Sequence, residues 1–114
     1  MTTGLQTIVY PVRDLAAAKR VHTALFGEPH TDQPYYVGYA VGEQQVGLDP
    51  NGHRAGLTGP VGYWAVPDVE ASRQQLLAAG AVDVQTPHDV GGGMLLAVLA
   101  DADGNQVGLM QRPA

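Results

Sequence analysis

The alternation of apolar and polar residues predicts short strands separated by two helices. Leu5–Tyr10 is β-branched and apolar enough for a strand, which Pro11 ends. Asp14 then suits a helix N-cap, apolar residues recur at helical spacing as far as Phe26, and Gly27 follows as a typical C-terminal stop. The beginning of the chain therefore predicts a strand and then a helix over 14–26.

The next segment has the pattern of a β-hairpin. Tyr35–Val41 and Gln44–Asp49 flank the dipeptide Gly42-Glu43, a two-residue loop with glycine first, as a type II′ turn requires. A short additional strand is expected near His30–Gln33. The loop length pairs Tyr36 with Asp49 and places both side chains on one face of the sheet.

After the connector Pro50–Pro60 the same order of elements returns, which indicates an internal duplication. The tetrapeptide Gln-Val-Gly-Leu ends both halves, at 45–48 and at 106–109. The predicted fold class is α+β, with two βαβββ modules over about 5–49 and 61–111 in a single domain of residues 1–114. The predicted elements of the second module are Val61–Val66, the helix Val69–Ala79 between Asp68 and Gly80, and strands near Val82–Thr86, Met94–Ala100 and Gln106–Gln111.

Composition removes several classes of function. The 114 residues carry a net charge of −5 and no basic patch, which argues against nucleic acid as a partner. Cysteine is absent, so disulfides, thiolate nucleophiles and Cys-ligated metals are excluded. No apolar run approaches the roughly 20 residues that span a bilayer, and no secretion signal precedes the first strand. We therefore expect a cytoplasmic protein with no membrane partner.

Two motifs within the duplicated pattern resemble a known superfamily. Tyr10-Pro11-Val12-Arg13-Asp14-Leu15 follows the first strand, and Asp101-Ala102-Asp103-Gly104-Asn105 precedes the last one. Set in paired modules, these motifs resemble the glyoxalase/bleomycin-resistance/extradiol-dioxygenase (vicinal oxygen chelate, VOC) superfamily. The resemblance implies two curved mixed sheets that enclose one cleft, often within a homodimer.

The same resemblance implies where a divalent metal would be held in catalytic members. The first and last strands of each module supply the ligands there, usually His, Glu or Gln. The corresponding positions in this chain are Thr7, Gly47, Val61 and Gly108. Glycine and valine offer no donor atom, and one threonine hydroxyl cannot hold a divalent ion. We therefore expect neither a metal nor another cofactor.

The histidines leave an enzymatic alternative open. His22 lies within the predicted helix, where a packed imidazole is expected, and His30 is expected to be solvated. His53 follows a turn that could bring it near Asp49, and His88 lies in a predicted loop before three glycines. A metal-dependent lyase, isomerase or dioxygenase with unusual ligands such as Asp49, His53 and His88 is the alternative to simple binding, and an interaction module without a ligand is a third.

Strand alternation and the family positions together define a candidate binding site. Its largely apolar character, with few polar groups, is typical of a small-molecule pocket. The leading hypothesis is metal-free binding of a small aromatic or planar molecule that stacks on Tyr36 and Tyr63, with Asp49 favouring a cationic group. No catalytic residue is assigned, and whether the protein is an enzyme stays open. The predicted site residues are Thr7, Tyr36, Gly47, Asp49, His53, Val61, Tyr63, Gly108 and Met110.

Overall fold

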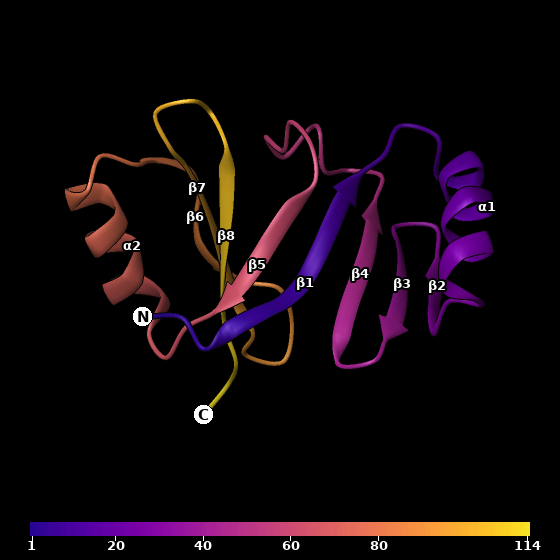
Figure 1. Cartoon of the computed structure of the whole chain (residues 1–114), viewed down its shortest axis with the longest axis horizontal. Coiled ribbons are helices and arrows are strands. Elements are labelled where there is room, and N and C mark those ends of the chain that lie inside the picture. The colour runs from indigo at the N-terminus through magenta and orange to yellow at the C-terminus, as the bar shows by residue number, and fades with distance from the viewer. The chain divides into compact units, whose positions relative to one another are not determined.

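The computed structural model describes all 114 residues and divides them into two compact units (Figure 1). The first unit comprises Gln6–Val61, and the second comprises Met1–Leu5 together with Gly62–Ala114. Each unit contains one helix and four adjacent strands. The predicted α+β fold with two βαβββ units is therefore confirmed.

The first unit repeats the predicted order of elements, with the short additional strand included. Its strands lie in the order β2-β3-β4-β1, in which β1 runs parallel to β4 and the other pairs are antiparallel (Figure 1). The first two residues of β1 are counted with the second unit. The elements are β1 (Gly4–Pro11), α1 (Leu15–Phe26), β2 (Thr31–Gln33), β3 (Tyr36–Val41) and β4 (Gln44–Asp49).

The hairpin of β3 and β4 has the register that its loop predicts. Gly42 has φ 59, the left-handed value that the first position of such a turn needs. Val37 lies opposite Leu48, and Gly38 lies opposite Gly47. Because side chains alternate along a strand, this register decides which residues face the helix and which face away from it.

Helix α1 covers one face of the first unit's sheet. Val37, Tyr39 and Leu48 are fully buried there, and Val46 is almost so. The Tyr39 hydroxyl is hydrogen-bonded with Thr23 Oγ1 at 2.8 Å, so its one polar atom is satisfied inside the core. Apolar residues that pack around this cluster are Tyr10, Val12, Leu15, Ala18 and Phe26.

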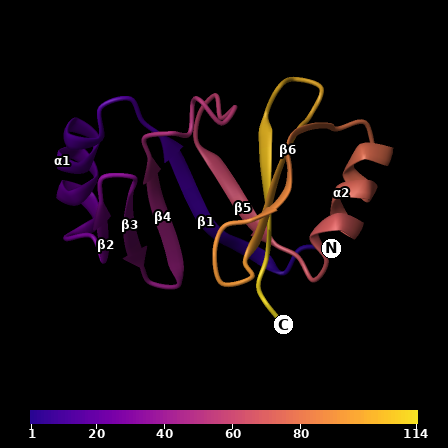
Figure 2. The same cartoon turned by 180° about the vertical axis from the view of Figure 1, so that it is seen from behind.

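The second unit has the strand order β5-β8-β7-β6, with β5 parallel to β8. Helix α2 packs against β6, β7 and β8 (Figure 2). The chain's first residues join this unit, because the Thr3 amide donates to the Ala65 carbonyl at 3.0 Å. The elements are β5 (Val61–Ala65), α2 (Val69–Ala78), β6 (Val82–Asp89), β7 (Leu95–Ala100) and β8 (Gln106–Gln111).

Strand β6 is longer than the sequence predicts. The expected end was Thr86, but pairing with β7 continues past Pro87 to Asp89. The register shifts between Gln85 and His88, and β6 lies at the edge of the sheet. An edge strand with an irregularity tolerates proline, because the missing amide has no ladder partner to lose. The expectation that His88 lies in a loop was therefore wrong.

Both helices begin at the predicted aspartates. The Asp14 carboxylate accepts from the Ala17 amide at 3.0 Å, and the Asp68 carboxylate accepts from the Ala71 amide at 3.0 Å. Gly27 ends α1 with φ 84, a conformation that other residues rarely adopt. Neither helix has the length and apolar character needed to cross a bilayer.

Helix α2 is joined to its sheet by an apolar core and an ion pair. Val66, Val69, Leu99 and Leu109 are buried between the helix and the strands. On the rim, the Arg73 guanidinium donates two hydrogen bonds, of 2.9 and 2.7 Å, to the carboxylate of Asp83 on β6. This contact holds the pKa of Asp83 below its ordinary value.

Candidate functional site

The two units divide the predicted site residues between them. The first unit holds those at positions 7, 36, 47, 49, 53 and 61, and the second holds those at 63, 108 and 110.

In the first unit, the ring of Tyr36 covers two cross-strand glycines. A Cβ built on Gly47 would lie 2.5 Å from Cζ and 2.9 Å from Cε1 of Tyr36, and one built on Gly38 would lie 3.2 Å from Cε2. The ring thus approaches Gly38 on its own strand, β3, and Gly47 on the neighbouring strand, β4. The tyrosine can lie across the sheet in this way because neither glycine has a side chain. We call this ring, seated on the two glycines, the aromatic platform.

The polar end of the platform lies beside a carboxylate. Burial raises the pKa of the Tyr36 hydroxyl, and the negative charge of Asp49 raises it further. The hydroxyl makes no hydrogen bond within the protein, so its proton can be donated to a bound molecule. Asp49 Oδ1 accepts from the Asn51 amide at 2.8 Å, which fixes the carboxylate at the end of β4. Tyr36 and Asp49 are therefore brought together, as the hairpin register indicates.

Two residues of this face were not among the predicted site residues. His30 Cε1 lies 3.4 Å from the Cβ position of Gly38, beside the platform. His30 is exposed, as expected, and its two ring nitrogens are also hydrogen-bonded within the protein, with Thr31 Oγ1 at 2.9 Å and with Gln45 Oε1 at 3.0 Å. Alternation along β4 places Gln45 on the face of Gly47, and this could have been read from the sequence. His30 directly precedes β2, and the short strand expected near His30–Gln33 carried no assignment of faces.

The other predicted residues of the first unit differ in their burial and in their neighbours. Thr7 and Val61 are buried, with Val61 wholly inaccessible. His53 Nε2 lies 3.3 Å from Arg13 Nη1, and the carboxylate of Asp49 is engaged by the adjacent turn. The structure therefore shows His53 with an arginine as its neighbour.

The second unit contains a related arrangement on β5 and β8. Tyr63 lies directly across from Gly108, and a Cβ on Gly108 would lie 2.5 Å from Cδ1 and 2.7 Å from Cγ of that ring. The same Cβ would lie 2.9 Å from the carbonyl oxygen of Gly62. Tyr63 and Met110 are both buried. In each unit, a tyrosine thus covers the glycine at which the superfamily resemblance implies a metal ligand.

The residues present do not fit a divalent metal. Within each unit, no three His, Asp or Glu side chains are grouped so that they could hold an ion. His88 Nδ1 is 2.9 Å from the carbonyl oxygen of Thr86 on its own strand. The positions implied by the resemblance carry two tyrosine-covered glycines, a buried valine and a single hydroxyl, which is too few donors for such an ion.

Comparison with known proteins identifies the fold. No protein-family model and no curated sequence matches the chain. Among solved structures, an NAD-dependent benzaldehyde dehydrogenase from Legionella pneumophila is similar with a TM-score of 0.72 and 15% identity, over 94% of this chain and 98% of the other. A glyoxalase/bleomycin resistance protein/dioxygenase superfamily member from Vibrio splendidus has a TM-score of 0.70 and 16% identity, over 95% and 99%.

A third similar structure is methylmalonyl-CoA epimerase from Mycobacterium tuberculosis, with a TM-score of 0.69 and 18% identity over 99% of this chain and 90% of the other. The names of these three proteins describe different activities, and one fold serves many functions. The likeness nevertheless extends over nearly the whole of every chain compared. This protein therefore has the fold of the glyoxalase/bleomycin resistance protein/dioxygenase superfamily.

Proposed function

We propose that the protein binds a small, planar, positively charged organic molecule without the help of a metal ion. The observation that carries this proposal is the aromatic platform, in which the Tyr36 ring lies on Gly38 and Gly47. The ring is only partly exposed and is held by the sheet, so a planar ligand can stack on it without ordering a flexible side chain.

The charge preference follows from the groups around the platform. Asp49 carries the nearest negative charge and is partly exposed at the end of β4. The protein as a whole has a net charge of −5, which favours the approach of cations. The Tyr36 hydroxyl, whose pKa is raised, stays neutral at physiological pH and can donate one hydrogen bond to the ligand.

Metal-independence is proposed from the donor set. The glycines at 47 and 108 supply no ligand atoms, and the space beside each is taken by a tyrosine. One protein with this fold, a methylmalonyl-CoA epimerase of 15% identity and TM-score 0.70, has been solved with methylmalonyl-CoA and NH4+. That neighbour illustrates a use of the fold in holding a small organic molecule, which we extend to this chain as a proposal.

The test uses proflavine, a planar fluorescent cation, with binding measured by fluorescence anisotropy. Tyr36→Leu removes the platform and Asp49→Asn removes the charge, and each change is expected to weaken binding about three- to tenfold. The matched control is Tyr35→Leu, because Tyr35 is the neighbouring residue but is 65% exposed and lies outside the platform. This control should bind proflavine like the wild type.

Three results would overturn the proposal. One is an equal loss of binding in Tyr35→Leu and Tyr36→Leu, which would mean that the dye associates with any tyrosine on the surface. Another is binding that neither Tyr36→Leu nor Asp49→Asn changes. The third comes from elemental analysis and native mass spectrometry of the purified protein: close to one zinc, iron, manganese or nickel per chain, whose removal abolishes binding, would show that a metal is required.

A further inference from the structure

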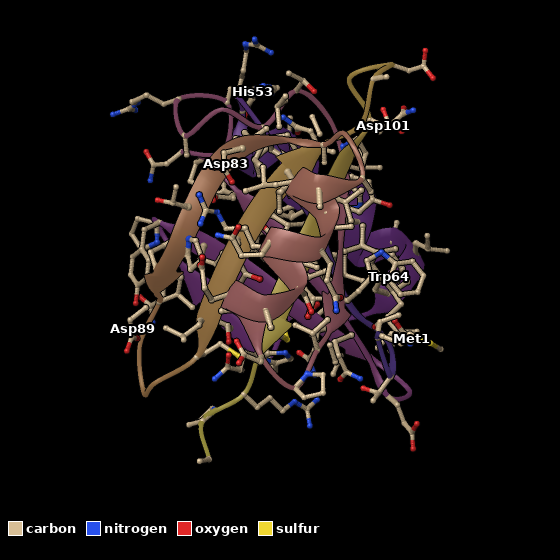
Figure 3. The ribbon with its side chains drawn as sticks, turned by 90° about the vertical axis from the view of Figure 1, so that its left-hand side faces the viewer. Met1, His53, Trp64, Asp83, Asp89 and Asp101 are labelled. Carbon is tan, nitrogen blue, oxygen red and sulfur yellow. The ribbon has the colours of Figure 1, made fainter.

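A pocket in the second unit lies away from the tyrosine-covered glycine, on the helix side of the sheet. It has a volume of about 340 Å³ and opens between helix α2 and strands β5 and β8. Trp64 forms one wall and is 39% exposed, which is unusual for so large an apolar side chain. Figure 3 shows Trp64 and Met1 on the same side of α2, and both border the pocket.

The internal duplication explains why the space exists. In the first unit, Tyr10 and His22 have ring centroids 4.9 Å apart, and His22 and Phe26 have centroids 5.9 Å apart. The column continues to Tyr39, whose centroid is 5.5 Å from that of Phe26. Aromatic rings therefore fill the region between α1 and its sheet.

The second unit has lost most of this column. Counted from the capping aspartates Asp14 and Asp68, Trp64 occupies the place of Tyr10, while Leu76 and Gly80 occupy the places of His22 and Phe26. The strand partner of Val107 is Leu99, whereas the equivalent Val46 is paired with Tyr39. Trp64 thus keeps the first position of an aromatic column that has no further rings.

The lining of the pocket indicates what could replace those rings. Val66, Leu76, Val107 and Leu109 make its walls apolar, and no charged side chain borders it. Ser72 and Gln75 also line it, and their side chains make no hydrogen bond within the protein. A neutral ring with one polar group would find here both a stacking surface and a hydrogen bond.

We propose that this pocket binds a small, uncharged aromatic molecule that stacks on Trp64 and forms a hydrogen bond with Ser72 or Gln75. The volume is at the lower end of the range of about 300–1,000 Å³ for small-molecule sites, so one or two rings suffice. The site goes beyond the function proposed above, because it lies in the second unit, on the helix side of that unit's sheet, and selects a neutral ligand.

The chain offers a direct reporter, because Trp64 is its only tryptophan. The probe is 4-nitrobenzyl alcohol, a neutral aromatic quencher, titrated while Trp64 fluorescence is recorded. We expect saturable quenching by the protein, in contrast to the linear collisional quenching of N-acetyltryptophanamide. Ser72→Leu, which fills the pocket from α2, should raise the dissociation constant roughly tenfold or more while leaving the reporter in place.

The matched control is Ala71→Leu, which adds a similar side chain at the neighbouring exposed position of α2. It should retain saturable quenching, and circular dichroism should show both variants folded. Linear quenching in the wild type, or equal loss in both variants, would overturn the proposal. So would a blue shift of Trp64 emission that grows with protein concentration together with a dimer in sedimentation, since a second copy would then cover the pocket.

The two proposed sites can fail separately. If the platform proposal alone is wrong, Tyr36→Leu and wild type will bind proflavine equally while Ser72→Leu still loses 4-nitrobenzyl alcohol. If the pocket proposal alone is wrong, the pattern will be the reverse.

Discussion

The aromatic platform makes a specific prediction about a single methyl group at Gly47. In Gly47→Ala the new Cβ would lie 2.5 Å from Cζ and 2.9 Å from Cε1 of Tyr36. Ordinary contacts between carbon atoms are about 3.5–4.0 Å, so the ring must move. Gly47 does not have a positive φ, and its backbone therefore accepts alanine without strain. The cost of the substitution thus arises from the tyrosine.

Two terms of opposite sign determine how Gly47→Ala changes the free energy of unfolding. Overpacking of a well-filled site costs about 1–3 kcal/mol. Replacing a glycine within a strand by alanine gains about 0.5–1 kcal/mol, because the unfolded chain becomes less flexible. In the wild-type background we therefore expect Gly47→Ala to destabilise the protein by about 0.5–2 kcal/mol. In the Tyr36→Ala background the first term disappears, and the same substitution should stabilise by about 0.5–1 kcal/mol.

The assay is a double-mutant cycle of four proteins, each unfolded in urea and followed by far-UV circular dichroism. The control is Gly59→Ala, because a Cβ on Gly59 would have no atom within 4 Å. Its effect should be the same in both backgrounds.

A change of sign between the two backgrounds would support the placement of the ring. If Gly47→Ala has the same effect with and without Tyr36, then the ring does not lie on this glycine, and the proposed ligand site loses its basis. If Gly59→Ala also depends on the background, the coupling is not specific to the platform.

Substitutions at Gly108, Leu48 and Asp49, and the oligomeric state, test further features of the structure. In urea unfolding, Gly108→Ala should destabilise the protein both alone and in the Tyr63→Ala background, because a backbone oxygen of β5 lies 2.9 Å from the new Cβ and cannot move away. Loss of this destabilisation in the Tyr63→Ala background would contradict the prediction. Leu48→Ala should cost about 2–5 kcal/mol, while Leu25→Ala, at a residue 75% exposed, should change stability by less than about 0.5 kcal/mol; equal effects would refute the core assignment. Asp49→Asn should lower the pKa of the platform hydroxyl in an ultraviolet titration but leave it above about 10, since burial is the larger cause of the raised pKa. The stability that this hydroxyl contributes should be complete below that pH and should fall above it. The chain should sediment as a homodimer, because β2 and β6 leave sheet edges unpaired, and a monomer at tens of micromolar would count against it.

Most of the fold could be predicted because local signals agree with the tertiary structure. The caps Asp14 and Asp68 mark the start of each helix, and Gly42-Glu43 determines the register of the hairpin. The register in turn predicts that Leu48 faces the helix, as the buried cluster confirms. These features depend on neighbours in sequence, where propensity and alternation are informative.

The details of the site depend on contacts that alternation does not describe. Alternation placed Tyr36 on the correct face but could not indicate that its ring lies down over two glycines, because that depends on side-chain rotamers. His30 was missed because its partner, Gln45, lies on a distant strand, which alternation does not indicate. The end of β6 was missed because Pro87 normally interrupts a strand and only its edge position permits it.

The division of the chain has a consequence for synthesis on the ribosome. The first unit is continuous in sequence, from residue 6 to 61, so all of its strands are available once β5 begins to emerge. Thr2 and Thr3 form their hydrogen bonds with the second unit later, because their acceptor, the Ala65 carbonyl, is made about sixty residues later. At roughly 5–20 residues per second this delay lasts several seconds, during which the Thr3 amide lacks its native acceptor. A bulky fusion placed before Thr3 would therefore interfere with folding of the second unit, which is made later, and leave folding of the first unit unchanged.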